Sequence, residues 1–256
     1  MEAYFFGGNA RQLFGAFHEA SGSGEHGVVL AYPGPQEYMQ SHYAFRLLAA
    51  QLAREGRSVL RFDWSGTGDS AGDGDSVSFQ QWRNDLQLAV QELKDVSNAR
   101  TVSIIGFRLG ASIAASTPFK QPIEALVLWN PVVRGQNYLE ELGARARRRF
   151  GDLLEPPPWW RQGHAHELLG HAISSAHLAE IEALDLARQA VSSAGRLSVI
   201  THKMTSQQQG LLTALKERGV KAELEEVEDA GAHFHDDSML LPGATVARLA
   251  GRLKAV

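Results

Sequence analysis

Cysteine is absent from the 256-residue sequence. This absence excludes disulfide bonds, thiolate metal sites and a cysteine nucleophile. Long apolar runs are missing as well, because no stretch approaches the ~20 apolar residues that a membrane helix needs. The first residues lack a charged segment followed by an apolar core, so no secretion signal is expected. Together these absences predict a cytoplasmic protein.

Charge of one sign is also scarce, since 25 basic and 29 acidic residues give a net charge of -4. This balance does not favour nucleic acid or an anionic membrane as a partner. The single basic cluster is short and its pattern is helical. We interpret it as a solvated helix face made of Arg145, Arg147, Arg148 and Arg149.

The composition that is present is typical of a globular protein, with 44% hydrophobic and 21% charged residues. At this length we expect one domain, residues 1–256, with a large buried core. Apolar segments typical of strands alternate with amphipathic segments typical of helices. The strands are expected at residues 3–6, 13–18, 27–32, 58–62, 101–105, 123–129, 196–201 and 222–227. The helices are expected at residues 39–54, 79–96, 108–116, 207–218 and 244–254.

This alternation predicts an α/β fold with about eight mostly parallel strands flanked by helices. The first two strands are expected to form an antiparallel pair at one edge of the sheet. Between residues 134 and 184 the alternation breaks. We interpret this stretch as a small helical cap that is inserted over the carboxyl edge of the sheet.

The segment Gly106-Phe-Arg-Leu-Gly110 lies between a predicted strand and a helix of small residues. This is the place and the spacing of a nucleophile elbow, G-x-S-x-G, whose glycines allow a strained strand-to-helix turn. Such a turn directs its central side chain out of the sheet, beside free backbone N–H groups. In this sequence the central residue is Arg108 instead of serine.

Four segments, YPGPQEYMQSH, VLRFDWSGTGDSAG, IIGFRLGA and LVLWNPVVRG, resemble in their order a group of α/β-hydrolase relatives found beside bacterial exopolysaccharide and exosortase genes. The similarity covers residues 27–138. The resemblance implies an α/β-hydrolase fold, and some members of the group carry arginine at the elbow. These relatives are commonly labelled hydrolases without an established reaction, so the resemblance implies a class of protein and no substrate.

A serine hydrolase needs an activated hydroxyl, a histidine base and a carboxylate that orients the base. Arginine cannot supply the nucleophile, because its guanidinium pKa lies above ~12. The usual acid position follows the strand at 196–201, where the sequence reads HKMTS. Asp63 is one alternative acid. His233, between the last strand and the last helix, is the expected base, so two of the three roles are empty or displaced.

Two roles are open for Arg108. It can join a helix N-terminus in binding an anion or a developing oxyanion. Alternatively it forms an internal ion pair with Glu37, in the loop after the third strand, since that loop normally faces the elbow. Glu37 is also a candidate general base if burial raises its pKa, although a nearby arginine lowers it. The residues expected to contact substrate are Leu109, Gly34, Gln36, Asp63 and Trp64.

Other polar residues favour structural interpretations. The spacing of His164, His166 and His171 fits no metal motif, and neither a metal nor another cofactor is expected. The loop 65–70 lacks the lysine of a phosphate-binding P-loop. Its Ser65 is the one alternative hydroxyl nucleophile. Trp159 and Trp160 are expected either to contact a substrate or to pack the cap against the body.

Two functions remain open. The first is a hydrolase-like or acyl-handling enzyme for a small acidic or acyl substrate, with His233 for acid–base work and Arg108 for oxyanion stabilisation. The second is a non-catalytic pseudo-hydrolase that binds a small anionic ligand or a partner protein. An open pocket faced by both residues favours the first. A pocket filled by a Glu37–Arg108 pair favours the second.

Overall fold

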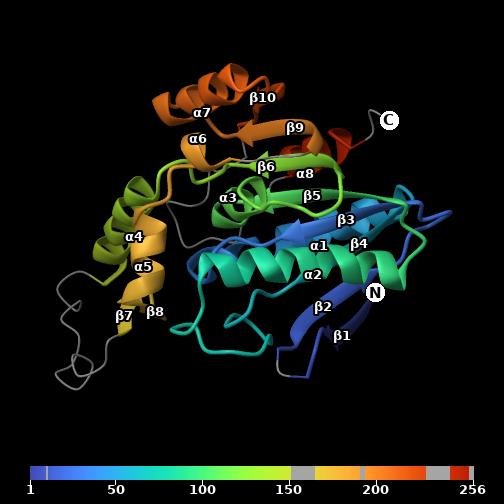
Figure 1. Cartoon of the computed structure of the whole chain (residues 1–256), viewed down its shortest axis with the longest axis horizontal. Helices are drawn as coiled ribbons and strands as arrows, with labels where there is room; N and C mark the ends of the chain where they lie inside the picture. The colour runs from blue at the N-terminus through green and yellow to red at the C-terminus, as the bar shows by residue number, and fades with distance from the viewer. Residues whose placement is uncertain (10, 151–164, 191–193, 229–242, 254–256) are drawn as a thin grey trace.

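The computed structural model describes residues 1–9, 11–150, 165–190, 194–228 and 243–253. An eight-stranded sheet lies at its centre (Figure 1). In sheet order the strands are β1 (Glu2–Phe6), β2 (Leu13–His18), β4 (Arg57–Phe62), β3 (His26–Ala31), β5 (Thr101–Phe107), β6 (Ile123–Trp129), β9 (Ala194–Thr201) and β10 (Ala222–Glu226). Strand β2 pairs antiparallel with β1 and β4, and the remaining neighbours pair in parallel. The expected sheet, with its antiparallel pair at one edge, is confirmed.

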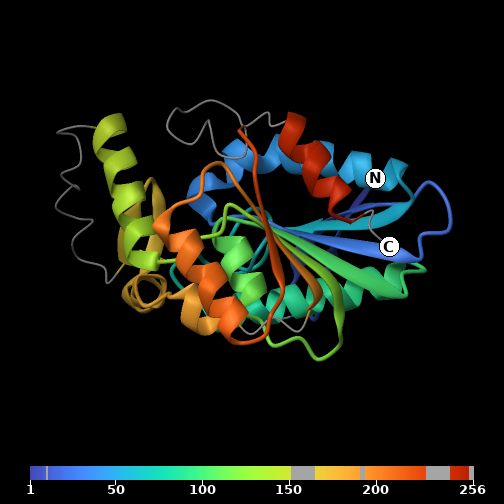
Figure 2. The ribbon, with the colours of Figure 1, turned by 90° about the horizontal axis from the view of Figure 1, so that it is seen from above.

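Helices cover both faces of this sheet (Figure 2). Helices α1 (Pro35–Arg54) and α8 (Gly243–Gly251) lie on one face, and α2 (Phe79–Val96), α3 (Leu109–Ala115) and α7 (Ser206–Glu217) lie on the other. Helix α1 begins at Pro35 instead of residue 39. Proline is favoured in the first helical turn, because the N–H that it lacks has no partner there.

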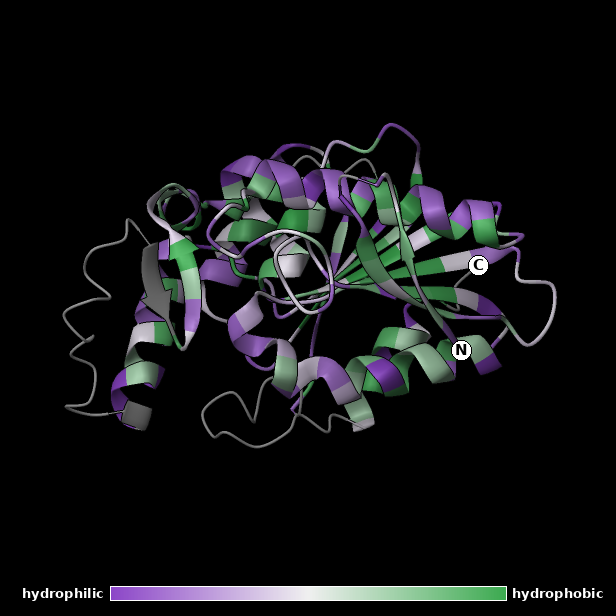
Figure 3. Cartoon of the chain, turned by 90° about the horizontal axis from the view of Figure 1, so that it is seen from below, coloured by the Kyte–Doolittle hydropathy of each residue, from purple (hydrophilic) through white to green (hydrophobic). Residues whose placement is uncertain are grey.

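The apolar central strands form the core between the two helical layers (Figure 3). In β3 and β5 nearly every residue is buried. Parallel strands covered on both faces are continuous apolar runs, which is why the sequence predicts them well. Their packing holds the carboxyl ends of β3, β5, β6 and β9 at one edge of the sheet, where the candidate site lies.

The chain leaves the sheet after β6 and returns as the neighbouring strand β9. The described part of this β6–β9 connection holds α4 (Gly135–Phe150), the hairpin of β7 (Ala165–Leu168) and β8 (His171–Ser174), α5 (Ser175–Glu182) and α6 (Leu186–Gln189). It lies beyond the carboxyl ends of the strands (Figure 1). At its base, Arg134 and Asp185 form an isolated antiparallel bridge, so its two ends meet.

The hairpin in this connection is not predicted from the sequence, because each of its strands has only four residues. Among the described residues, no helix is long and apolar enough to cross a membrane.

Candidate functional site

A strained turn joins β5 to α3 and carries Arg108 at its centre. Arg108 has φ 50° and ψ -119°, which is rare for a residue with a side chain. A Cβ atom on Gly106 would lie 2.6 Å from Ala111 Cα, and one on Gly110 would lie 2.0 Å from the carbonyl oxygen of Tyr32. Both positions therefore require glycine.

The Arg108 guanidinium is held by two carboxylates. Its Nε donates to Glu37 Oε1 at 2.9 Å, and its Nη2 donates to Glu141 Oε2 at 2.6 Å. Arg108 is 8% exposed and Glu37 is fully buried. Burial lowers the pKa of Arg108, but the charges of Glu37 and Glu141 outweigh burial and raise that pKa above its ordinary value. The Glu37–Arg108 ion pair, one of the two roles left open for Arg108, is thus present, although Glu37 lies in the first turn of α1 and not in a loop.

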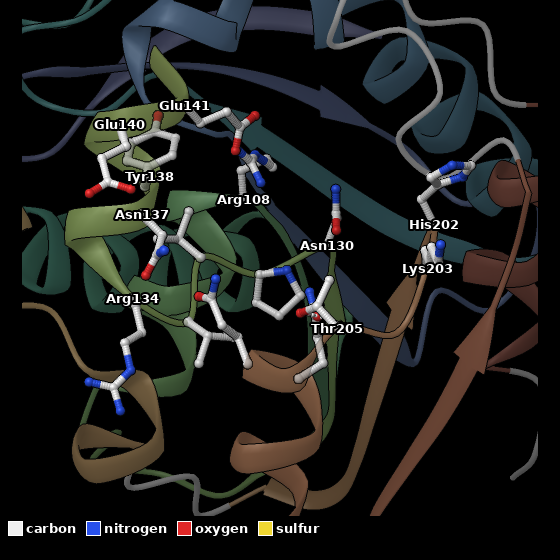
Figure 4. Close-up of a pocket in the computed structure, with 15 residues that line it drawn as sticks. Arg108, Asn130, Arg134, Asn137, Tyr138, Glu140, Glu141, His202, Lys203 and Thr205 are labelled. Carbon is white, nitrogen blue, oxygen red and sulfur yellow. Dashed lines mark hydrogen bonds and ion pairs between the residues drawn. The ribbon is translucent and has the colours of Figure 1, made fainter. Parts of the chain in front are cut away.

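Two further side chains of α4 contact the buried Glu37. Tyr138 donates its hydroxyl to Glu37 Oε2 at 3.0 Å, and Arg145 Nη1 lies 3.6 Å from Glu37 Oε1. Figure 4 shows Tyr138 and Glu141 extending from α4 towards Arg108. We call Glu37, Arg108, Tyr138, Glu141 and Arg145 the ionic cluster. Its two carboxylates and two guanidinium groups balance, so the ionic cluster is neutral overall.

The expectation that Arg145 belongs to a solvated helix face is wrong. Arg145 is buried and also donates to Gln40 Oε1 at 2.9 Å. It follows Tyr138 by seven residues and Glu141 by four, which places the three side chains on one face of α4. This spacing is the sequence signal that could identify them. The two arginines at 147–148 are exposed, as expected.

A cavity of about 550 Å³ opens beside the ionic cluster (Figure 4). It is bounded by the end of β6, by α4 and by the start of α7. We call it the cluster cavity. Its polar lining consists of Arg108, Asn130, Arg134, Asn137, Tyr138, Glu140, Glu141, His202, Lys203, Thr205, Gln207 and Gln208. This lining suits a polar, hydrogen-bonding ligand better than an apolar one.

Lys203 brings a positive charge to the α7 side of the cluster cavity, and Glu140 brings a negative charge from α4. His202 and Lys203 stand after β9, where a hydrolase would carry its acid. The first turn of α7 adds the partial positive charge of a helix N-terminus. Arg134 forms an ion pair with Asp185, with 3.3 Å between Arg134 Nη1 and Asp185 Oδ2.

The other predicted contact residues do not line the cluster cavity. Leu109 and Gln36 line a second cavity, of about 210 Å³. Gly34 precedes α1, and a Cβ atom there would lie 3.3 Å from the Tyr138 hydroxyl. A larger residue at this position would therefore press against the Tyr138 and Gln36 side chains.

Asp63 and Trp64 stabilise the loop after β4 and line neither cavity. Asp63 accepts the Tyr38 hydroxyl at 2.7 Å and the Asp69 N–H at 3.1 Å. Burial raises the pKa of Asp63 against the effect of these two hydrogen bonds. Trp64 is 1% exposed, and its Nε1 donates to the carbonyl oxygen of Tyr32 at 2.9 Å. Trp64 is thus a core residue.

Ser65, the alternative nucleophile, is bound directly to a carboxylate. Its hydroxyl donates to Asp85 Oδ1 at 3.0 Å, and its N–H donates to Asp85 Oδ2 at 2.9 Å. Among the described residues, the Ser65 hydroxyl is bonded directly to the Asp85 carboxylate, and no histidine ring connects the two groups. The arrangement therefore anchors the loop to α2 and lacks the histidine base of a serine hydrolase triad.

Several predicted residues cannot be placed. His233, His164, Trp159 and Trp160 lie outside the described residues. Within the described ranges, no group of three His, Asp or Glu side chains could hold a metal ion.

The eight-stranded, mostly parallel sheet with helices on both faces defines the class of protein, the α/β-hydrolases. More narrowly, the chain belongs to the serine aminopeptidase family S33 (Hydrolase_4), whose family model matches residues 24–207. No curated protein matches the chain.

Solved structures share this fold across nearly the whole chain. An esterase from Pyrococcus furiosus is 20% identical with a TM-score of 0.65, over 99% of this chain and 89% of that one. A putative hydrolase from Agrobacterium vitis is 15% identical with a TM-score of 0.62, over 99% and 97%. Mouse alpha/beta hydrolase domain-containing protein 10 is 15% identical with a TM-score of 0.59, over 99% and 97%. At these identities the similarity shows the fold alone.

Proposed function

We propose that this chain is a non-catalytic relative of the α/β-hydrolases that binds a small acidic molecule in the cluster cavity. One observation carries the proposal: Arg108 is bonded to Glu37 and Glu141. In this proposal the β5–α3 turn is the counterpart of the nucleophile elbow, and the β6–β9 connection is the cap. The side chain at the elbow is then a paired cation, which has no nucleophilic atom.

The charge left over in the cluster cavity supports an acidic ligand. The ionic cluster is neutral and Glu140 lies on the α4 side of the cavity, so an acidic ligand would bind on the opposite side, next to Lys203, His202 and the first turn of α7. A carboxylate is the complementary group. Asn130 and Asn137 can donate hydrogen bonds to the rest of the ligand. The resemblance to the exopolysaccharide- and exosortase-associated group supports an accessory role in biosynthesis.

The proposal is tested first by hydrolysis of p-nitrophenyl acetate and butyrate. The wild type, Arg108→Ser and His233→Ala are compared. Because Arg108→Ser leaves buried Glu37 without its main partner, the double variant Arg108→Ser/Glu37→Gln keeps the site neutral. We expect no wild-type turnover above buffer. Turnover that disappears in His233→Ala would instead establish a serine-free enzyme and overturn the proposal.

Ligand binding is tested by calorimetric titration with succinate. Lys203→Met should weaken binding about tenfold, because a charge-assisted hydrogen bond is lost. Lys216→Met is the matched control, since Lys216 is exposed in the last turn of α7, away from the cluster cavity. Equal affinity in wild type and Lys203→Met, or no binding of succinate by the wild type, counts against the proposal.

A further inference from the structure

The second cavity lies between the body of the protein and the β6–β9 connection. Its walls come from the start of α1, the loop after β4, the start of α2, and β8 with α5. Its apolar lining includes Val77, Trp82, Leu109, Ile173 and Ile181, and its polar lining is Gln36, Thr67, His171 and His177. At about 210 Å³ it is much smaller than the cluster cavity.

One buried polar side chain in this wall lacks a hydrogen bond. His177, in α5, is 3% exposed and lines the cavity. Its ring packs edge-on against Phe79 and Trp82, with centroid distances of 5.3 and 4.9 Å. Its Nδ1 lies 3.4 Å from Glu180 Oε2 without forming a hydrogen bond. The Nδ1 side of the ring faces Glu180, and no described residue forms a hydrogen bond with Nε2, so Nε2 is the ring nitrogen left for a ligand. We call the space beside it the His177 cavity.

The environment of His177 fixes what kind of partner it accepts. Burial lowers the pKa of His177 against the opposing charge of Glu180, so the ring is neutral near neutral pH. Glu180 Oε2 also accepts the Phe79 N–H at 2.8 Å, which holds the carboxylate in place. The Glu180 carboxylate lies beside Nδ1 and therefore favours the His177 tautomer that carries its proton on Nδ1. In that tautomer Nε2 has no proton and accepts a hydrogen bond. A neutral acceptor in an apolar wall matches a hydroxyl donor and disfavours an anion.

We propose that the His177 cavity binds a small uncharged molecule that has an apolar ring or short chain and one hydroxyl group. The hydroxyl donates to His177, and the apolar part packs against Trp82 and Ile173. The size agrees, because an apolar cavity of about 150 Å³ in another protein holds benzene. Among the described residues, the two cavities have no lining residue in common. This inference therefore does not depend on the acidic ligand of the cluster cavity.

Benzyl alcohol, toluene and benzoate are suitable probes, because they share a ring and differ in the group attached to it. Each is titrated into the full chain and followed by the NMR signal of the Trp82 indole N–H. That N–H donates to the Ser65 carbonyl oxygen, and its ring lines the His177 cavity. We expect the Trp82 signal to shift, and benzyl alcohol to bind at least fivefold more tightly than toluene. Benzoate should bind most weakly.

His177→Phe is the matched variant, because it keeps an aromatic ring against Trp82 and removes both ring nitrogens. It should abolish the preference for benzyl alcohol while toluene still binds. His26→Phe, at an exposed histidine at the start of β3, should leave the preference unchanged. The proposal is overturned if the wild type shows no preference, or if the preference persists in His177→Phe. It is also overturned if benzyl alcohol shifts signals of Lys203 and Asn130 but not of Trp82, and that outcome would leave the function proposed for the cluster cavity standing.

Discussion

At the scale of single residues, the fold holds buried cations against fixed acceptors. The ionic cluster is one case, and Arg61 is another. Arg61 is 5% exposed, and it donates from Nε to His18 Nε2 at 3.2 Å and from Nη1 to the Tyr32 hydroxyl at 2.8 Å. His18 can accept this bond only while it is neutral. Burial and the charge of Arg61 lower the pKa of His18 to about 4.

We predict that His18 makes stability sensitive to acid. Its folded-state pKa of about 4 lies below the unfolded value of about 6.5, so the unfolded chain binds the proton more readily. The free energy of unfolding should therefore be unaffected by this residue above about pH 6.5 and fall towards pH 4. Water near the ring screens part of the effect, and we expect a loss of about 1–2 kcal/mol. Urea unfolding of wild type and His18→Gln, which keeps an acceptor but does not titrate, measures this loss. An equally steep pH dependence in both proteins would contradict the prediction.

Residue roles are predictable from sequence where topology alone brings two residues together. Glu37 and Arg108 follow neighbouring parallel strands, so their pairing can be inferred from the order of the strands. Trp64 misleads, because an indole suits a ligand-binding wall and a protein core equally well. Its hydrogen bond to Tyr32 depends on packing that no local pattern records.

At the scale of elements, charged and polar side chains fasten α4 to the body. Tyr138 and Arg145 reach Glu37 of α1, and Glu141 reaches Arg108 of the β5–α3 turn. The strands could be predicted from apolar runs, because their burial is continuous. The docking of α4 could not, because it depends on the orientation of a helix relative to partners about a hundred residues earlier.

We predict that Glu141→Gln loosens α4. The Glu141 carboxylate is 31% exposed, so losing its charge should cost about 1 kcal/mol. Amide hydrogen exchange in residues 136–148 should then be about fivefold faster. Glu140→Gln is the control. Glu140 precedes Glu141 in the sequence and lines the same cavity, but the ion pair with Arg108 is made by Glu141. Similar exchange rates in the two variants would show that the ionic cluster does not hold the helix.

At the scale of the whole molecule, the β6–β9 connection is an insertion, because the pairing of the eight strands does not involve it. Strands β6 and β9 pair directly, and Arg134 meets Asp185 where the connection begins and ends. The Gly135 N–H also donates to the Leu184 carbonyl oxygen at 2.9 Å. The connection nevertheless supplies a wall to both cavities.

Replacing residues 136–183 with a short Gly-Ser linker should therefore leave a folded sheet. We expect a cooperative thermal transition by circular dichroism, with a lower Tm because apolar contacts such as those of Leu142 and Ile181 are lost. Binding of succinate and of benzyl alcohol should both disappear. A shortened chain without a cooperative transition would mean that the connection is part of the folding core.

The turn at Arg108 separates backbone shape from side-chain chemistry. Gly106, Gly110 and the hydrogen bond from the Arg108 N–H to the Trp129 carbonyl oxygen set its conformation, and none of these involves the guanidinium. A single substitution at position 108 can therefore change the side chain at the turn while the backbone of the turn and the sheet stays the same. A serine at this turn would still lie beside Glu37 and Glu141, whose charges would repel a developing oxyanion. Under the function proposed above, a nucleophile at this turn would therefore require changes at its two acidic neighbours as well as at position 108.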